Sequence, residues 1–209
     1  MKINEICYDQ RSNNFIFTIR GKSYRISYNK YIEWNLHIGD LLTLDQMETI
    51  RQEDAVNCCQ TDALRYASYK KRSESEIRRK LSEGGYDADL IDIAVKSLIK
   101  LGYIDDRSYT EAFISDQVRL NLRSRIQIYA KLKEKGIDEE TIRSGLARLT
   151  DEKEANTLDR IIEKKCRIRP PRDERERDRL IRSLQRRGFS YALIRQAVSK
   201  LSIEDNPDD

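Results

Sequence analysis

The chain has 209 residues, of which 38% are hydrophobic and 36% are charged, a balance that excludes one thick apolar core and favours small helical bundles with solvated faces. Its net charge of +4 is uneven, because residues 1–56 carry 7 basic and 8 acidic side chains whereas residues 160–190 carry 12 basic and 5 acidic ones. The second segment favours a polyanion or an acidic protein surface as the partner.

Residues 1–56 differ in texture from the rest and are predicted to form a small β-rich module with one helix. Residues 3–8, 15–20 and 23–28 alternate apolar with polar side chains and are rich in β-branched and aromatic residues, which is typical of strands. Gly21-Lys22 predicts a two-residue type II′ turn between the last two strands, because glycine stands first.

The second half of this module should cover the sheet. Tyr31, Trp34 and Leu36 are expected on one of its faces. Thr43 and Gln46 have the spacing of a capping box and predict a helix that ends near Val56. The aromatic residues fit either a base-stacking platform or an ordinary core, and the small size of the module favours the core.

From residue 57 onward the helical pattern dominates and predicts three units of three helices. The expected units are residues 57–105, 106–150 and 151–203, followed by an acidic tail at 204–209. The expected helices lie near residues 61–71, 74–83 and 88–101, near 107–121, 125–135 and 139–149, and near 152–167, 174–187 and 191–201. Pro170-Pro171 breaks the third unit after its first helix. The predicted fold is therefore mainly α, with three tandem three-helix repeats in an elongated array after the β-rich module.

The same punctuation recurs in each unit. Gly85, Gly136 and Gly188 are 51 and 52 residues apart, and each has a leucine four positions before it and an apolar residue directly after it. This spacing indicates a Schellman stop, in which glycine adopts positive φ at no steric cost. The next residue is of an N-cap type in every copy, namely Asp87, Asp138 and Ser190. A repeat of this length indicates an array of equivalent units.

Two capping boxes and two glycines lie at further turns and helices of the repeats. Ser73 with Glu76 opens the middle helix of the first unit, and Ser124 with Gln127 repeats the pattern one period later. Alanine at Gly136 is expected to destabilise the fold, because a Cβ is unfavourable at positive φ. Alanine at Gly145, in the middle of a predicted helix, is expected to be neutral or stabilising.

Motifs for catalysis are missing from the sequence. It contains no Gly-rich phosphate loop, nucleophile elbow or HExxH motif. Asp105-Asp106 has the composition of a divalent-ion site, but a helix N-cap is the favoured interpretation. The cysteines show no CxxC spacing and His37 is the one histidine, so no metal or cofactor is expected and no enzyme activity is predicted.

Basic residues gather around the middle helix of each unit. A row of helical units can follow a long, negatively charged object one repeat at a time, although charge on a helix surface is often mere solvation. We therefore predict that these residues contact DNA or a protein bound to it. They are Arg72, Arg78 and Arg79 in the first unit; Arg119, Arg123, Arg125, Lys131, Lys133 and Lys135 in the second; and Arg179, Arg182, Arg186 and Arg187 in the third.

Four stretches together resemble the successive signatures of the bacterial RecX regulatory proteins. They are ALRYASYKKRSESEIRRKL at residues 63–81, LGYIDD at 101–106, KLKEKGI at 131–137 and LQRRGFS at 184–190. The resemblance spans residues 61–201 and leaves the N-terminal module outside its strongest part. Two departures are Arg123-Ser124, where many members have glycine, and the prolines that lengthen the link in the third unit.

The resemblance implies three tandem three-helix repeats and a regulator of the RecA recombinase. Such a protein binds the RecA-DNA filament and inhibits ATP hydrolysis and strand exchange, and so modulates recombination and DNA repair. We expect weak, non-specific binding to single-stranded DNA and to duplex DNA, no membrane partner, no cofactor, and a cytoplasmic monomer, since no signal peptide, long apolar run or lipidation motif is present. A tandem helix-turn-helix DNA-binding protein and a purely protein-binding scaffold remain alternatives.

Overall fold

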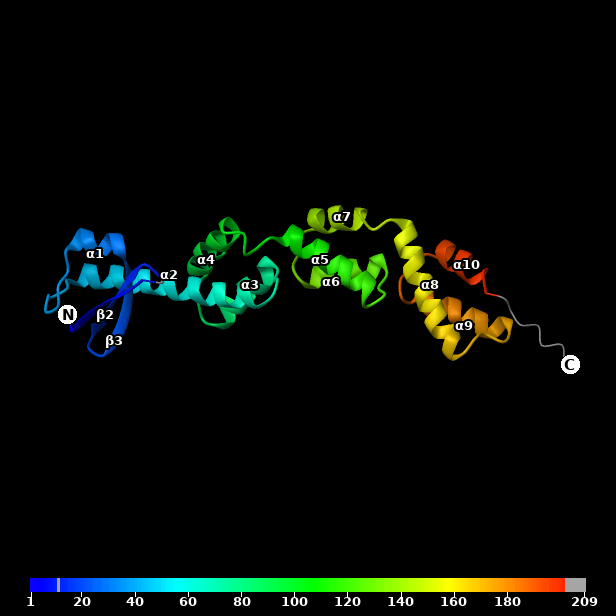
Figure 1. The fold of residues 1–209 in the computed structure, drawn as a ribbon, viewed down its shortest axis with the longest axis horizontal. Coiled ribbons are helices and arrows are strands. Elements are labelled where there is room, and N and C mark those ends of the chain that lie inside the picture. The colour runs from blue at the N-terminus through cyan, green and yellow to red at the C-terminus, as the bar shows by residue number, and fades with distance from the viewer. Residues whose placement is uncertain (11, 202–209) are drawn as a thin grey trace. The chain divides into compact units, whose positions relative to one another are not determined.

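A computed structural model describes residues 1–10 and 12–201; the predicted acidic tail at 204–209 lies outside the described residues. The chain divides into two compact units (Figure 1). The first consists of Met1–Lys71 and Ile77–Ile104, and the second of Arg72–Glu76 and Asp105–Asp209. The first turn of the helix that follows Ser73 therefore belongs to the second unit.

The first unit begins with the predicted antiparallel sheet. Its three strands lie in the order β1 (Glu5–Asp9), β2 (Asn14–Ile19) and β3 (Lys22–Ser27). Because Ile19 pairs with Lys22, the hairpin turns at Arg20 and Gly21, whose φ angles are 51° and 77°. Two positive φ angles indicate a type I′ turn, so the type II′ turn predicted at Gly21-Lys22 is wrong by one residue.

A core forms on one face of this sheet, as predicted. Helix α1 (Tyr28–Trp34) lies over it, and Phe17, Ile26 and Leu36 are buried beneath. Tyr31 stacks on Phe15 with ring centroids 3.7 Å apart. Trp34 packs against the same cluster, so the module's aromatic residues serve mainly its core.

Helix α2 (Leu44–Tyr69) runs without interruption for 26 residues, so the predicted end near Val56 and restart near Thr61 are wrong. Residues 56–61 contain no glycine or proline to stop the helix. The capping box of Thr43 and Gln46 is confirmed at its start. The predicted boundary between residues 56 and 57 falls inside this helix, and the domain limits themselves stay predictions.

The same helix contributes to two cores and covers one edge of the sheet. Ile50 belongs to the core of the β module, whereas Ala63 belongs to the core of the first repeat. Asp54 accepts a hydrogen bond from the backbone N–H of Arg25 at 2.8 Å, and Glu53 accepts one from Ser27 at 3.0 Å. Strand β3 therefore leaves these two donors unavailable for pairing with another strand.

Three bundles of three helices follow, as predicted. Each has its own apolar core, centred on residues such as Ile77 in the first, Ile128 in the second and Leu158 in the third. Pro170-Pro171 separates the first two helices of the last bundle. The elongated form of the array stays a prediction. The first bundle consists of the end of α2, α3 (Glu74–Glu83) and α4 (Ala88–Lys100). The second consists of α5 (Asp106–Arg119), α6 (Arg125–Glu134) and α7 (Glu139–Ala147). The third consists of α8 (Asp151–Ile168), α9 (Glu174–Gln185) and α10 (Tyr191–Val198).

The three helix stops have the predicted geometry. Gly85, Gly136 and Gly188 adopt φ angles of 84°, 74° and 84°. Around Gly136 the two Schellman bonds run from Ile137 N to Leu132 O at 3.1 Å and from Gly136 N to Lys133 O at 2.9 Å, and the other copies repeat them. The side chains of Asp138 and Ser190 cap the next helices. Asp87 occupies the cap position without a side-chain bond, so that part of the prediction is wrong.

Gly145 lies at a close contact between helices α5 and α7. A Cβ at this residue would be 2.8 Å from Cγ2 of Thr110 and 2.9 Å from Cδ1 of Ile114. These distances are too short for van der Waals contact. These contacts argue against the expectation that alanine is harmless here, because the close packing of α7 on α5 opposes the gain in helix propensity.

Candidate nucleic-acid interface

Many of the predicted basic residues form ion pairs with acidic neighbours. Exposed pairs of this kind contribute little to stability, and an incoming phosphate can replace the carboxylate. These side chains can therefore still bind phosphate, but with lower affinity than unpaired cations. The pairs are Arg78 with Asp92 at 2.5 Å, Arg79 with Glu83 at 3.9 Å, Arg119 with Asp116 at 3.6 Å, Lys131 with Glu134 at 2.9 Å and Lys133 with Glu139 at 2.8 Å.

The pair of Lys133 and Glu139 shifts the pKa values of both side chains. Lys133 and the hydroxyl of Tyr129 both donate hydrogen bonds to Glu139, and they lower the pKa of its carboxyl from 4.5 to about 2. The same contact raises the pKa of Lys133. The Glu139 carboxylate therefore stays ionised and paired with Lys133, so a phosphate would have to displace it from this lysine.

Lys135 helps to join the start of α3 to the turn after α6, all within the second compact unit. The Ser73 hydroxyl donates to the backbone carbonyl of Lys135 at 2.7 Å and accepts from the N–H of Glu76 at 3.2 Å. The Lys135 ammonium donates to Glu76 at 2.6 Å. Ser73 and Glu76 are both buried, so this lysine satisfies buried polar groups.

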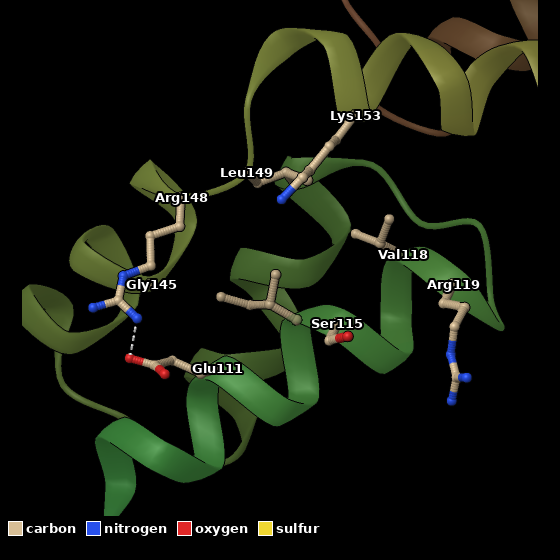
Figure 2. Close-up of a pocket in the computed structure, with 9 residues that line it drawn as sticks. Glu111, Ser115, Val118, Arg119, Gly145, Arg148, Leu149 and Lys153 are labelled. Atoms are coloured by element: carbon tan, nitrogen blue, oxygen red, sulfur yellow. Dashed lines mark hydrogen bonds and ion pairs between the residues drawn. The ribbon is translucent and has the colours of Figure 1, made fainter.

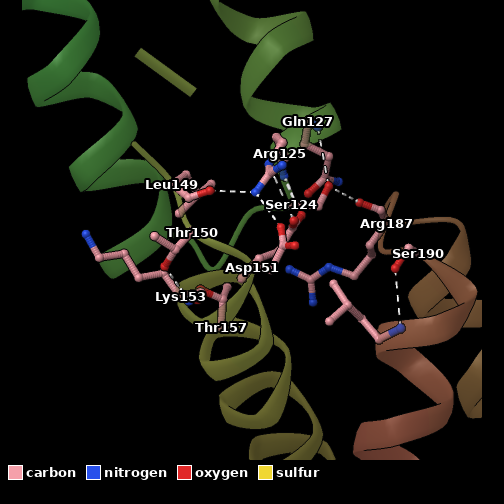
Figure 3. A network of polar contacts seen from close by, with 12 residues as sticks. Ser124, Arg125, Gln127, Leu149, Thr150, Asp151, Lys153, Thr157, Arg187 and Ser190 are labelled. Atoms are coloured by element: carbon pink, nitrogen blue, oxygen red, sulfur yellow. Dashed lines mark hydrogen bonds and ion pairs between the residues drawn. The ribbon is translucent and has the colours of Figure 1, made fainter. Parts of the chain in front are cut away.

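The start of α6 repeats this arrangement one period later. Ser124 donates its hydroxyl to the backbone carbonyl of Arg187 at 2.6 Å and accepts from the N–H of Gln127 at 3.3 Å (Figure 3). Arg187 in turn donates to the carbonyl of Leu122 at 3.3 Å. In the first two repeats, the serine hydroxyl that caps the middle helix therefore also donates to a backbone carbonyl at the turn of the next repeat. We call these two bonds, from Ser73 to Lys135 and from Ser124 to Arg187, the serine latch.

Arg125 has a structural position in the same network (Figure 3). Its guanidinium donates to the carbonyl of Leu149 at 2.5 Å and contacts Asp151 at 3.0 Å. The buried carboxylate of Glu154 accepts the Arg125 backbone N–H at 2.9 Å. These contacts tie α6 to the start of α8, and a phosphate ligand would have to compete with them.

Three predicted residues converge on a shallow pocket between the second and third repeats. Arg123 and Lys131 come from the second repeat and Arg187 from the third, and they line it together with Asn121 and Gln127. Glu134 is the one carboxylate in the lining, and the hydrogen bond from Lys131 lowers its pKa. Arg123 has no ion pair within the described part of the chain. Three cations and two amide side chains suit a phosphate group.

Helix α9 and its C-cap residue, Arg186, present a second group of cations. Arg179, Arg182 and Arg186 are exposed and form no ion pair among the described residues. Arg179 also lines a cleft with Lys165 and Arg169, two residues that the sequence analysis did not select. The basic composition of residues 160–190 was a signal for them, but only the fold places the end of α8 beside α9.

Asp105-Asp106 is a helix start, as favoured from the sequence. Asp105 accepts a bond from the N–H of Ser108 at 2.9 Å, and Asp106 accepts one from the N–H of Glu74 at 2.8 Å. Burial raises the pKa of Asp106. Within residues 1–10 and 12–201, no group of three or more His, Cys, Asp or Glu side chains is arranged to hold a metal ion.

Comparison with known proteins reveals the family. The family models for the first, second and third three-helix domains of RecX match residues 59–98, 105–146 and 151–198, respectively. The chain belongs to the RecX family. Its members are named regulatory proteins, and the family assignment predicted from the sequence is confirmed.

Relatives within the family extend over most of the chain. The Regulatory protein RecX of Lactococcus lactis subsp. lactis is 30% identical over 188 residues, which is 88% of this chain and 70% of the relative. That of Lactobacillus johnsonii is 27% identical over 209 residues, or 99% of this chain and 77% of the relative. The second match includes the N-terminal module, which therefore has a counterpart in at least one RecX protein.

Solved RecX structures share the fold. One crystal structure of regulatory protein RecX matches with a TM-score of 0.76 and 24% identity, over 95% of this chain and 99% of that chain. RecX from Lactobacillus salivarius matches with a TM-score of 0.63 and 25% identity, over 71% and 97%. Among the described helices, none combines the length and apolar character that a membrane span requires.

Proposed function

We propose that this protein binds the filament formed by the RecA recombinase on DNA and inhibits its ATP hydrolysis and strand exchange, without catalysis of its own. Family membership supports the regulatory role. The observation that carries DNA contact is the convergence of Arg123, Lys131 and Arg187 on one pocket from two adjacent repeats. The protein acts as a cytoplasmic monomer whose repeats engage the filament together.

The chemistry of the pocket suits contact with the DNA backbone. Arginine and lysine contacts to phosphate position a protein on DNA without reading its sequence, and they weaken as salt displaces them. Each contact is weak, so several repeats must act together to give useful affinity. When several repeats bind the filament together, the protein links neighbouring recombinase subunits. We expect this link to oppose the movements of the subunits during ATP hydrolysis and strand exchange.

The test is a double substitution, Arg123→Gln with Lys131→Gln, measured by fluorescence anisotropy on single-stranded DNA at several salt concentrations. The affinity should depend less steeply on salt: the negative slope of log affinity against log salt should become shallower by about 0.7 for each phosphate that the variant no longer neutralises. Inhibition of recombinase ATPase should require more protein. The matched control is Arg51→Gln with Arg143→Gln, which removes the same charge from exposed, ion-paired arginines elsewhere.

Three results would contradict the proposal. Equal loss of affinity in the control pair would show that net charge alone is responsible. Tight binding to one duplex sequence would favour a tandem helix-turn-helix protein. A wild-type protein without salt-dependent DNA affinity and without effect on the ATPase would favour a protein-binding scaffold.

A further inference from the structure

Another concave feature lies in the second compact unit, between α5 and α7 at the start of α8 (Figure 2). Its volume is about 300 Å³, and its lining is mainly apolar. Ile114 and Val118 on α5 and Leu149 after α7 supply the apolar surface. Ser115, also on α5, lines the same hollow. We call this feature the α5–α7 groove. Of the basic residues predicted from the sequence to contact DNA or a protein, Arg119 alone lines it.

The groove follows from the close packing of these two helices. Gly145 lines it and offers no side chain, and a Cβ there would collide with Thr110 and Ile114. The chain therefore cannot fill this hollow from α7. An apolar hollow that the protein's own side chains do not fill is a common mark of a binding site.

Cations surround the apolar lining. Arg119, Arg148 and Lys153 line the groove against one carboxylate, that of Glu111. Arg148 is ion-paired with Glu111, whereas Lys153 has no ion pair within the part of the chain that the structure describes. In Figure 2 the Lys153 side chain reaches from α8 toward the groove beside Leu149. The rim is therefore positive around an apolar centre.

The lining favours a protein segment over a nucleic acid. It contains no aromatic side chain on which an exposed base could stack. An apolar centre instead accepts an aliphatic or aromatic side chain, and positive charge at the rim complements carboxylates. This combination is that of a groove for an acidic segment with an apolar anchor.

We propose that the α5–α7 groove is the contact site for the protein partner, and that it seats an acidic segment whose bulky apolar side chain enters between Val118 and Leu149. Carboxylates of the same segment contact Lys153 and Arg119, and one of them replaces Glu111 as the partner of Arg148. The inference rests on the proposed function, because it takes the recombinase as that partner. It assigns protein contact to this groove and phosphate contact to the pocket of Arg123, Lys131 and Arg187.

The test is photo-crosslinking from inside the groove. p-Benzoylphenylalanine replaces Ser115, which is exposed, in the full chain, and the protein is mixed with recombinase filaments on single-stranded DNA. The same probe at Ala112, exposed on α5 outside the groove lining, is the matched control. After co-sedimentation and irradiation, the groove probe should give a crosslink to the recombinase that mass spectrometry maps to an acidic segment. The control probe should give little.

The outcomes separate the two proposals. If the protein sediments with the filament but the groove probe gives no crosslink, or gives one only to DNA or to a basic segment, the groove assignment is overturned and the proposed function survives. If the protein does not sediment with the filament at all, both fall. Crosslinks of equal strength from Ala112 also overturn the assignment, because contact would then not be specific to the groove.

A charge reversal provides an independent measurement. Lys153→Glu should weaken binding to the filament by about tenfold while leaving the affinity for free single-stranded DNA unchanged. Arg143→Glu, on the exposed surface of α7 outside the groove lining, is the control and should change neither quantity by as much. A parallel loss of filament and free-DNA binding in Lys153→Glu would overturn the assignment, since it would place this lysine in the phosphate interface.

Discussion

Ser124 donates its hydroxyl to the backbone carbonyl of Arg187 at 2.6 Å, and one period earlier Ser73 makes the same bond to Lys135 at 2.7 Å. In each case the serine precedes a middle helix, and the acceptor precedes the turn glycine of the following repeat. The third repeat has Asp173 in the serine position. A carboxylate can cap a helix but cannot donate to a carbonyl, so the third repeat lacks the donor that the latch requires.

The first prediction tests the serine latch. Ser124→Ala should destabilise the protein by about 1–3 kcal/mol, because it removes a helix cap and leaves a carbonyl without its donor. Ser124→Asp restores the cap but places a carboxylate against the Arg187 carbonyl, so it should be no better. Ser190→Ala removes an exposed cap alone and should cost less. Urea unfolding curves measure all three, and equal effects at Ser124 and Ser190 would contradict the latch.

The second prediction compares two turn glycines. Gly85→Ala should cost about 1–2 kcal/mol from the positive φ angle alone, since nothing lies within 4 Å of the added Cβ. Gly136→Ala should cost more, because its Cβ would also fall 2.4 Å from Cβ of Ser75. Thermal unfolding of the two variants gives the difference. A smaller loss at Gly136 than at Gly85 would show that Ser75 moves aside freely.

The third prediction concerns Gly145. Alanine should destabilise by about 1–3 kcal/mol despite its higher helix propensity, because its Cβ collides with Thr110 and Ile114. Thr110→Ser removes the nearest methyl group and should recover part of the loss. A double-mutant cycle from unfolding free energies measures this coupling. Additive effects of the two substitutions would indicate that the collision is relieved elsewhere.

The fourth prediction is a pH dependence. The folded state lowers the pKa of Glu139 from 4.5 to about 2, first through Lys133 and then through Tyr129. The folded form therefore binds fewer protons than the unfolded one between these values. The stabilising effect is present above pH 4.5 and is lost as the pH falls toward 2.

Glu139→Gln should accordingly flatten the acid side of the stability curve in that window. The effect will be modest because the pair is exposed to solvent. NMR titration of the Glu139 carboxyl carbon checks the pKa directly. A midpoint near 4.5 would contradict the prediction.

The fifth prediction concerns the third repeat. Replacing Arg179, Arg182 and Arg186 with Glu should reduce inhibition of the recombinase ATPase, since these exposed cations lack internal ion pairs among the described residues. Arg187 is left intact, because its carbonyl and guanidinium hold the junction with Ser124 and Leu122. Far-UV circular dichroism should be unchanged. Inhibition at the wild-type concentration would remove α9 from the interface.

Local physics explains what the sequence could predict. The starts and stops of the helices depend on residues within one turn of each other, so the capping boxes and the glycine of each Schellman stop were readable directly. Repeated spacing then indicated three bundles, and the resemblance of four stretches to RecX signatures indicated the family. Among the predicted cations, however, the sequence could not separate Arg123, which is free of ion pairs within the described residues, from Arg125, which the start of α8 holds.

What the tertiary structure decided involves residues far apart in the chain. The latch joins Ser124 to a carbonyl 63 residues away, and Gly145 is required by side chains of a different helix. Helix α2 continues through residues 56–61 because no residue there stops it and its two ends have cores to cover. The sequence pattern records which residues favour a helix, a cap or a turn. Only packing determines which of them meet, because contact between distant residues depends on the fold as a whole.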